Sequence, residues 1–424
     1  MLLKQKIDIA PITIVTLYTI AQLACLYIYG YTPYPDSNGY IFLAQESVNA
    51  NTFYPQSLTD IPFLWNVGAI NAVALSLYLF NSITPLLVLY TLMQGAMAWL
   101  TFAIARELFN SKVAYLALCL FVLYPSTYGC GTSLLSEVPF IFFSLLALLL
   151  MLKEHLLWSG ICFAMANYVR PMAIIFIVAA ILFMIYKRTK FKQFFLLLIG
   201  YFMITCSIGV SNYVTKGKYF TQGAMGWMGL MQYSWDHDSD READYYLFPN
   251  NDPNIIDESL NYDCLQRDSV WRSHFLRWLP NNVGEYFMQM PTKVIKTYIS
   301  DNVNFCAFLP DKEEREYMYE EISMSVIAED FPHWSRTQIL TVINLIYYYI
   351  LLILGILGGI HLLKKKNFYG FIIPAATIVS STALLVLVSH GEARFHQPFM
   401  PMFIMLAAYL VSELHIPSST HPKK

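Results

Sequence analysis

The sequence has few charged residues. Only 13% of its 424 residues are Asp, Glu, Lys or Arg, whereas a soluble domain has roughly 25%. Hydrophobic residues make up 56% and aromatic residues 16%, and the mean hydropathy is +0.46. So little polar surface cannot coat a water-soluble globule of this size. The net charge of -2 gives no indication of a nucleic-acid partner.

The sequence also lacks several common motifs. Its seven cysteines form no CxxC or Cys/His pattern, which excludes the usual zinc sites, and most lie in apolar runs where cysteine acts as a small hydrophobe. There is no internal repeat and no low-complexity tract. The first apolar run continues to about Tyr31 without a small-residue cleavage site. We therefore expect an uncleaved first helix rather than a signal peptide.

Long apolar segments dominate what remains. A membrane-spanning helix needs ~20 mostly apolar residues. Candidate spans lie near residues 9–31, 83–105, 113–128, 134–152, 156–169, 171–186, 193–214, 338–361, 370–389 and 397–414. The third and fifth are short, and the stretch 62–80 is apolar enough for an interfacial or re-entrant element. We expect an all-α polytopic membrane protein with about ten transmembrane helices.

The basic residues indicate the orientation. Lys and Arg concentrate in cytoplasmic loops. With the N-terminus in the cytoplasm, the basic clusters all fall on that side: Lys4 and Lys6, Arg106 and Lys112, Lys153, the run 187–192, the run 364–366, and the C-terminal lysines. Three segments then face outward, namely 32–82, 215–335 and the turn 390–394. This one-sided pattern supports the ten-helix count.

Three parts of the chain follow from this layout. They are an N-terminal transmembrane module, 1–214, which includes the first outer loop 32–82; an extracytoplasmic soluble segment, 215–335, between helices 7 and 8; and C-terminal helices with a cytoplasmic tail, 336–424. The outer segment mixes tryptophans with charge, unlike a disordered linker. Whether its two cysteines, Cys264 and Cys306, form a disulfide is left open. Its acidic run 236–242 resembles a calcium loop only in part, so a solvated loop is favoured.

Two acidic residues stand at the outer ends of predicted spans. Asp36 follows the first span, where a general base could meet a lipid-borne substrate. The alternative is that it caps the next helix. Glu137 lies at the outer entry of the fourth span, where an ionisable residue is energetically costly. Its alternative role is to complement the dipole of its own helix.

Two arginines lie on the same side. Arg170, before Pro171, runs against the positive-inside bias, and it either grips a phosphate or snorkels to the interface. The turn 390–398 holds His390, Glu392, Arg394 and His396 between two apolar spans. So dense a group of ionisable residues in so short a turn favours function over a solvated loop. Arg394 is the preferred phosphate ligand.

Taken together, these residues resemble the GT-C superfamily of polytopic glycosyltransferases, and within it the dolichyl-phosphate-mannose-protein mannosyltransferase and aminoarabinose-transferase type. The resemblance rests on Asp36 with Tyr40 and Leu43-Ala44, Ser136-Glu137 with Pro139-Phe140, Arg170-Pro171, and Glu392-Ala393-Arg394-Phe395 followed by Pro398 and Pro401. The neighbouring prokaryotic relatives of the GPI mannosyltransferases (PIG-V-like) share the Ser136-Glu137 and Arg394-Phe395 features. The subfamily therefore stays open.

The resemblance implies a sugar donor on a polyprenyl phosphate or dolichyl phosphate, and transfer outside the cytoplasm to a glycan, lipid or protein hydroxyl. It implies the role of base for Asp36. The chemistry of such a transfer indicates the rest: Arg394 and Arg170 bind the donor phosphate, a single displacement inverts the anomeric centre, Glu137 is a second catalytic residue, and Tyr40, Glu392, His390 and His396 are in support. Many relatives carry two adjacent acidic residues where this chain has Asp36-Ser37. No cofactor is required and no metal ligand is predicted. A divalent metal shared by Asp36 and Glu137 is compatible with the wider superfamily.

Two other functions compete with the enzyme. A transporter or flippase of lipid-linked sugars also carries intramembrane charge, but usually near the midplane and with repeat symmetry. A non-catalytic assembly subunit would tolerate replacement of Asp36. The compact chain and the absence of Asn-x-Ser/Thr sequons from the outer loops favour a bacterial plasma membrane, with the active site facing outward. Acceptor binding is the natural role for 215–335.

Overall fold

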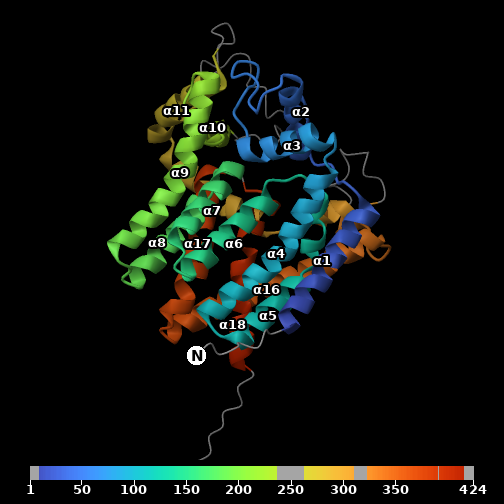
Figure 1. The fold of residues 1–424 in the computed structure, drawn as a ribbon. Helices are drawn as coiled ribbons and strands as arrows, with labels where there is room; N and C mark the ends of the chain where they lie inside the picture. The colour runs from blue at the N-terminus through green and yellow to red at the C-terminus, as the bar shows by residue number, and fades with distance from the viewer. Residues whose placement is uncertain (1–8, 236–261, 310–321, 390, 415–424) are drawn as a thin grey trace, which may run out of the picture.

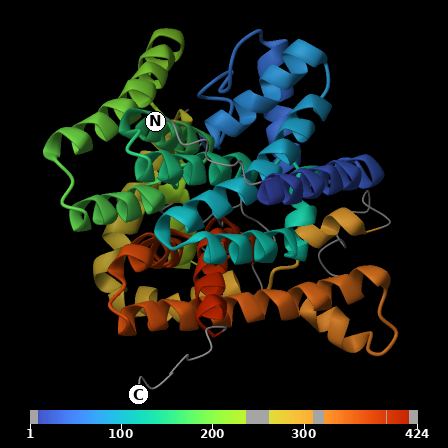
Figure 2. The same cartoon turned by 60° about the horizontal axis from the view of Figure 1, so that its bottom comes forward.

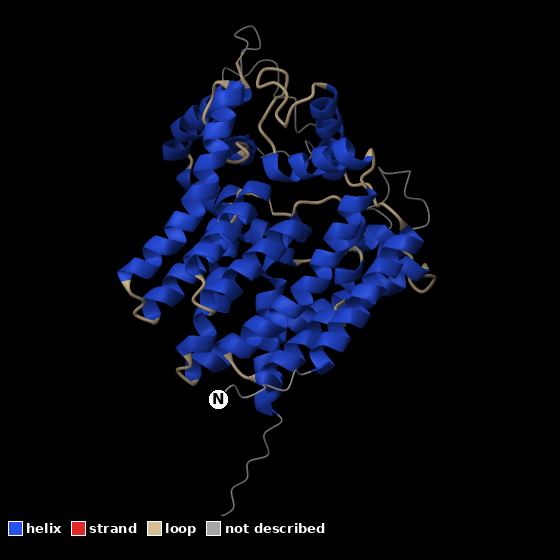
Figure 3. Cartoon of the chain, in the orientation of Figure 1, coloured by secondary structure: helices blue, strands red, loops and turns tan. Residues whose placement is uncertain are grey.

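The computed structural model describes residues 9–235, 262–309, 322–389 and 391–414. Within these ranges the chain is built from helices, and the single β-type pairing is an isolated bridge between Leu64 and Ala224 (Figure 3). The predicted class, an all-α polytopic membrane protein, is confirmed.

The helices follow one another along the chain as Figure 1 labels them. The first half contains α1 Ile9–Tyr29, α2 Pro35–Asn49, α3 Val67–Phe80, α4 Thr84–Leu108, α5 Ser111–Val122, η1 Pro125–Tyr128, η2 Cys130–Thr132, α6 Glu137–Leu152, α7 Leu156–Val169, α8 Ile174–Tyr186 and α9 Phe191–Lys216. The second half contains α10 Gly226–Trp235, α11 Cys264–Trp278, η4 Leu279–Asn281, α12 Val283–Met288, α13 Met290–Tyr298, η5 Val303–Phe308, α15 Met324–Glu329, α16 Arg336–Lys364, α17 Phe368–Val388, η6 Ala393–Phe399 and α18 Met400–Leu414.

Each of the ten predicted spans coincides with a helix. Among the described residues, six helices are long and apolar enough to cross a membrane: α1, α4, α9, α16, α17 and the continuous stretch Ala393–Leu414. The segment predicted at 113–128 is α5, which meets the 3-10 turns η1 and η2 at a bend of 65°. Helices α6, α7 and α8 have 16, 14 and 13 residues, fewer than the ~20 that span a bilayer unaided.

Close helix contacts hold these shorter helices in the bundle. A Cβ on Gly160 of α7 would lie 2.0 Å from the carbonyl oxygen of Leu197, and one on Gly200 of α9 would lie 2.1 Å from that of Leu157. The two glycines thus let the backbones of α7 and α9 approach directly, as small residues do between membrane helices. One large apolar core then runs through α4, α5, α6, α8 and α18.

An outer layer covers one end of the bundle. Figure 1 shows α2 and α3 there, together with α10 and α11, and in Figure 2 the blue segments of α2 and α3 stand at the upper edge of the bundle. The two outer segments share a core, because Phe63 of the first loop packs with Trp271 and Phe275 of α11. The Tyr286 hydroxyl of α12 donates a 2.5 Å hydrogen bond to the carbonyl of Leu387, which ties this layer to α17.

The open questions about 215–335 are answered in part. Cys264 and Cys306 are both buried free thiols that belong to separate apolar clusters, so they do not pair in this structure. The acidic run 236–242 lies outside the described residues. The proposed boundaries at 214/215 and 335/336 remain a prediction.

Candidate active site

Four elements, α2, α6, α7 and η6, bring charged residues to one place at the end of the bundle that carries α2 and α3. Asp36 lies in the first turn of α2, which begins at Pro35, where the fixed φ of proline suits a helix start. Glu137 is the first residue of α6, and Arg170 is the C-terminal cap of α7. Arg394 lies in η6, the 3-10 turn that leads into α18.

Arg394 is the centre of the group. Its Nη2 lies 2.7 Å from Asp36 Oδ2, and its Nε lies 2.8 Å from Glu392 Oε1 and 3.9 Å from Glu137 Oε1. Its side chain is only 13% exposed. One guanidinium therefore bridges carboxylates from α2, α6 and the turn before η6. The N-cap of α2 is Tyr34, so Asp36 does not occupy the capping position and lies one residue inside the helix start.

Arg170 joins the same group through Glu137. Its Nη1 lies 2.9 Å from Glu137 Oε1 and donates a 2.9 Å hydrogen bond to Ser136 Oγ. The guanidinium also lies over the Phe395 ring, 5.4 Å from its centroid, while Arg394 lies 5.7 Å from that centroid. Because Arg170 is nearly buried and turned into the protein, it does not snorkel to the interface.

Tyr40 forms the wall beside these charges. Its hydroxyl accepts a 2.6 Å hydrogen bond from Asn66 Nδ2, and the same amide lies 3.3 Å from Ser136 Oγ. The Tyr40 ring packs edge-on against Trp65. Burial raises the pKa of Tyr40 above its ordinary value. Tyr40 therefore stays a neutral phenol that fixes the position of α2 relative to α6.

The charges of this arginine cluster (Asp36, Glu137, Arg170, Glu392 and Arg394) do not balance, because three carboxylates face two guanidinium groups. Burial raises the pKa of Asp36; Arg394 opposes that rise, while Glu392 and Glu137 add to it. A carboxylate with a raised pKa is a stronger base than an ordinary aspartate. The Asp36 side chain is still 25% exposed, so a substrate can reach it.

His396, two residues after Arg394, lies in a different cluster. Its Nδ1 lies 2.9 Å from the Thr297 carbonyl, and its Nε2 lies 3.1 Å from Asp301 Oδ1. Both ring nitrogens thus lie next to oxygen atoms, one of a backbone carbonyl and one of a carboxylate. The side chains of His396 and Asp301 are 0% and 1% exposed. His396 does not touch the arginine cluster, and its influence on that cluster passes through η6.

Asp301 is surrounded by donors. Ser126 Oγ donates to Oδ1 at 3.1 Å, Tyr124 donates to Oδ2, and Asn344 Nδ2 donates to Oδ2 at 3.0 Å and to the Asp301 carbonyl at 2.6 Å. This Asp301 network (Tyr124, Ser126, Asp301, Asn344 and His396) links η1, α16, η6 and the chain before η5. It fixes the start of the α18 stretch relative to the outer layer.

The structure thus brings five of the eight predicted site residues into the arginine cluster and places Tyr40 beside it. His396 lies in the Asp301 network, and His390 lies outside the described residues. The residues that sequence reasoning missed are Asn66, which holds Tyr40, and Asp301. Asn66 could have been found from the sequence, because it is a polar residue directly before an apolar helix, α3. Asp301 stood in no motif, and only the fold brings it to His396.

The geometry can be compared with a divalent metal site shared by Asp36 and Glu137, which the sequence left possible. Arg394 occupies the position between these two carboxylates. In the described part of the chain, no three His, Cys, Asp or Glu side chains are grouped so as to hold a metal ion. The arrangement therefore does not fit a divalent cation between Asp36 and Glu137, and no step below passes through one.

Comparison with protein families finds a match over part of the chain. Residues 68–211, about a third of the chain, match the family model for dolichyl-phosphate-mannose-protein mannosyltransferase. The match contains Glu137 and Arg170, and it confirms the resemblance seen in the sequence. Together with the helical fold, it supports a membrane glycosyltransferase of the GT-C type. A search of curated proteins finds no match.

Proposed function

We propose that this protein transfers a sugar from a polyprenyl-phosphate donor to an acceptor hydroxyl on the extracytoplasmic face of the membrane, with inversion at the anomeric carbon. The observation that carries the proposal is the meeting of Asp36 and Arg394 at 2.7 Å, from helices that are distant in sequence. A base and a cation in one partly exposed site match the two needs of the reaction, which are proton removal and stabilisation of a phosphate leaving group.

Arg394 and Arg170 are the proposed ligands of the donor phosphate. Guanidinium groups bind phosphate oxygens bidentately, and a phosphate leaving group needs no general acid. In the unliganded site both arginines contact carboxylates, and Glu137 Oε1 lies 2.9 Å from one and 3.9 Å from the other. An entering phosphate replaces part of these ion pairs. Glu137 then holds the two guanidinium groups side by side.

Asp36 is the proposed base. When Arg394 turns to the phosphate, Asp36 loses its nearest cation and becomes more basic. It then accepts the proton of the acceptor hydroxyl as the new C–O bond forms and the bond from the anomeric carbon to the phosphate oxygen breaks. A single displacement of this kind inverts the anomeric centre, as in one-step glycosidases. The phosphate leaves on its lipid with the electron pair of the broken bond.

The partners follow from this chemistry. They are a lipid-linked sugar and a glycan, lipid or protein acceptor. A bacterial plasma membrane is the proposed location, with the site outward. The residues 215–335 are proposed to bind the acceptor, because α10 and α11 lie with α2, which carries Asp36, in the layer that covers one end of the bundle. Exchanging this segment with that of a relative should alter acceptor choice, and unchanged acceptor choice would contradict the proposal.

The test uses purified protein in nanodiscs with a panel of polyprenyl-phosphate sugars. Release of polyprenyl phosphate is followed for the wild type and for Asp36→Asn, which keeps size and hydrogen bonding but removes the base. We expect donor binding to persist and release to disappear. Asp60→Asn is the matched control, since Asp60 is an exposed aspartate of the same outer loop.

The same assay separates the competing functions. Equal turnover in Asp36→Asn and the wild type would remove Asp36 from the mechanism. Donor binding without turnover on any acceptor would favour a transporter of lipid-linked sugars, and a flipping assay in liposomes would then decide. Chelation with EDTA tests metal dependence in the same samples, and we expect turnover to be unchanged.

A further inference from the structure

A cavity lies inside the bundle next to the arginine cluster. It is lined by residues from α4, η1, α6, η5, η6 and α18, and Glu137 forms part of its wall. It offers about 40 Å³ to the centres of water-sized molecules, enough for about three of them. Because Glu137 Oε1 lies 2.9 Å from Arg170, one side chain separates the cavity from the proposed phosphate site.

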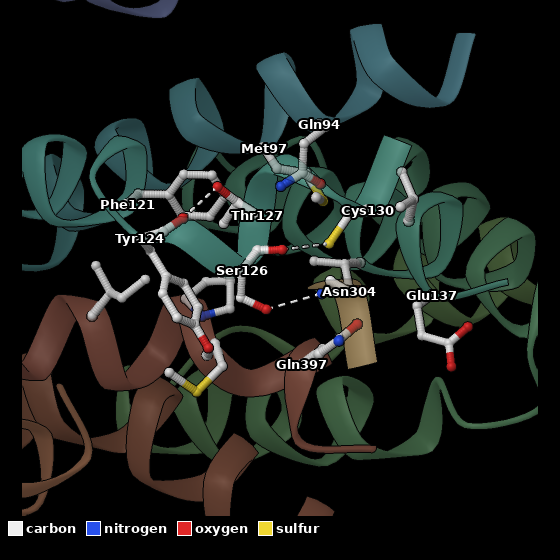
Figure 4. A pocket seen from close by; sticks show the side chains of 15 residues that line it. Gln94, Met97, Phe121, Tyr124, Ser126, Thr127, Cys130, Glu137, Asn304 and Gln397 are labelled. Carbon is white, nitrogen blue, oxygen red and sulfur yellow. Dashed lines mark hydrogen bonds between the residues drawn. The ribbon is translucent and has the colours of Figure 1, made fainter. Parts of the chain in front are cut away.

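Two amide side chains on the cavity wall have a terminal atom without a hydrogen-bond partner among the described residues. They are Oε1 of Gln94, on α4, and Nε2 of Gln397, on η6, and both atoms are buried. Gln94 is 1% exposed and uses its other terminal atom, Nε2, to reach the Tyr18 hydroxyl. Figure 4 shows Gln397 with Asn304 and Glu137 among the side chains that line the cavity. An acceptor and a donor therefore line one small space.

The other polar side chains of the wall are already engaged. Ser126 donates to Asp301 and accepts a 3.0 Å hydrogen bond from Asn304, which Figure 4 marks, and Tyr124 also donates to Asp301. The Asp301 network thus holds this wall rigid and leaves the two glutamines to bind what enters. Unsatisfied buried amide atoms are energetically costly, so a polar occupant is favoured.

The rest of the lining is apolar. Met97, Ile141, Met400 and Ile404 offer no hydrogen bond, and they pack as well against C–H groups as against each other. A ligand that suits this surface has a few hydroxyl groups on one edge and apolar faces. A sugar ring has this character, and two or three of its hydroxyl groups would replace the water molecules for which the cavity has room.

We propose that the cavity is the subsite for the hydroxyl-bearing edge of the donor sugar, and that Gln94 and Gln397 recognise its hydroxyl groups. The proposal rests on the proposed function, because it takes the phosphate of the same donor to lie on Arg394 and Arg170. Sugar recognition then comes from the two amides, whereas the arginines bind the phosphate whatever sugar it carries.

The test measures two affinities for each variant, one for a prenyl-phosphate hexose and one for the bare prenyl phosphate. Gln94→Leu and Gln397→Leu remove the amides with little change in volume. We expect each to weaken binding of the glycosylated donor about tenfold or more, as loss of a buried hydrogen bond to a substrate hydroxyl does, while the bare prenyl phosphate binds as tightly as before. Gln289→Leu is the matched control, since Gln289 also has a buried amide atom, Nε2, without a hydrogen-bond partner among the described residues but does not line the cavity.

Another variant and a series of deoxy-sugar donors distinguish a lost sugar contact from misfolding of the protein. Ile141→Phe narrows the cavity while keeping both amides, and it should show the same selective loss. With donors that lack single ring hydroxyls, at least one should bind the wild type and a glutamine variant equally. Unchanged binding of bare prenyl phosphate reports that each variant is folded.

Three results would overturn the proposal. Equal donor affinity in all variants means that the cavity holds water only. A raised KM for the acceptor, with donor affinity unchanged, means that the cavity receives a sugar of the acceptor instead. Equal losses for the bare and the glycosylated prenyl phosphate mean that the amides shape the phosphate site. Failure of the proposed function is distinct from these results, because the wild type would then bind neither prenyl phosphate nor its sugar conjugate.

Discussion

The protein contains two buried clusters of charge that differ in how completely they are satisfied. In the Asp301 network, the ion pair of His396 and Asp301 is at most 1% exposed, and both carboxylate oxygens accept hydrogen bonds. In the arginine cluster, Asp36 and Glu392 are 25% and 31% exposed, and three carboxylates compete for two guanidinium groups. One cluster is closed and complete, and the other is accessible and unbalanced.

The difference separates structure from chemistry. A network in which each group has its partner gains nothing from a ligand, and breaking it leaves buried polar groups without partners. A cluster with excess charge of one sign and access to solvent can exchange a carboxylate for a phosphate at small cost. Variants of the Asp301 network should therefore change stability first, and variants of the arginine cluster should change turnover first.

The largest expected effect is on stability. Asp301→Ala removes the carboxylate that His396, Tyr124 and Ser126 contact, and each buried polar group left without a partner costs about 1–3 kcal/mol. We expect a strongly lowered midpoint of thermal unfolding in nanodiscs, followed by tryptophan fluorescence. Asp60→Ala, at an exposed position, is the control and should melt like the wild type. A normal midpoint for Asp301→Ala would remove the distinction between the two clusters.

Arg394→Lys should give the converse result. Lysine keeps the positive charge but loses the planar fork that bridges Asp36 and Glu392, and it binds phosphate as a point charge. Turnover should fall about 10²–10³-fold, the usual effect of removing one group that stabilises charge in a transition state. The unfolding midpoint should change little. Arg277→Lys, at an exposed position of α11, is the matched control. A variant that melts early with normal turnover would assign Arg394 a structural role.

The sequence predicted the fold class well because apolar runs of membrane length leave few alternatives. Its main uncertainty was the length of individual spans. Helices α6, α7 and α8 are shorter than a bilayer requires and depend on their neighbours, as the contact of Gly160 with Leu197 shows. Such contacts depend on which helices lie side by side, and a single sequence contains no direct record of that.

A site residue could be predicted from the sequence only where its side chain is of an unusual type for its position. Glu137 and Arg170 stood out because charge at the end of a membrane helix is unusual. Asp301 did not stand out, because an aspartate in a polar outer segment is ordinary until the fold buries it against His396. The sequence grouped His396 with Arg394 by proximity along the chain. Two residues along a 3-10 turn point in different directions, which is why the two side chains enter different clusters.

A smaller effect is expected from the turn that joins the two clusters. Gly391 has φ +74°, and a Cβ there would lie 2.5 Å from the carbonyl oxygen of Lys293 on α13. Gly391→Ala therefore strains the backbone by about 1–2 kcal/mol and pushes the turn away from α13, which displaces Arg394. We expect lower kcat and a modestly lower unfolding midpoint.

Gly284→Ala is the control for this change, because a Cβ at Gly284 meets nothing within 4 Å. Alanine is also the better helix former, so this variant should be neutral or slightly stabilised. If Gly391→Ala has the kcat and midpoint of the wild type, the approach of α13 does not position Arg394, and the two clusters work independently.

The smallest expected effect is a shift in pH dependence. Asp36 acts as a base only when ionised, and burial raises its pKa, with Glu392 and Glu137 adding to the rise. Turnover is therefore lost as the pH falls through this raised value, at a higher pH than for an ordinary aspartate. Glu392→Gln removes one repelling charge but keeps an oxygen for Arg394 Nε, so the acid limb of kcat/KM should move to lower pH.

Glu46→Gln, on the exposed side of α2, is the control for this change and should leave the pH profile of kcat/KM unchanged. If Glu392→Gln leaves the limb in place, the titrating group is not Asp36, and the unbalanced charge of the arginine cluster does not set the strength of its base.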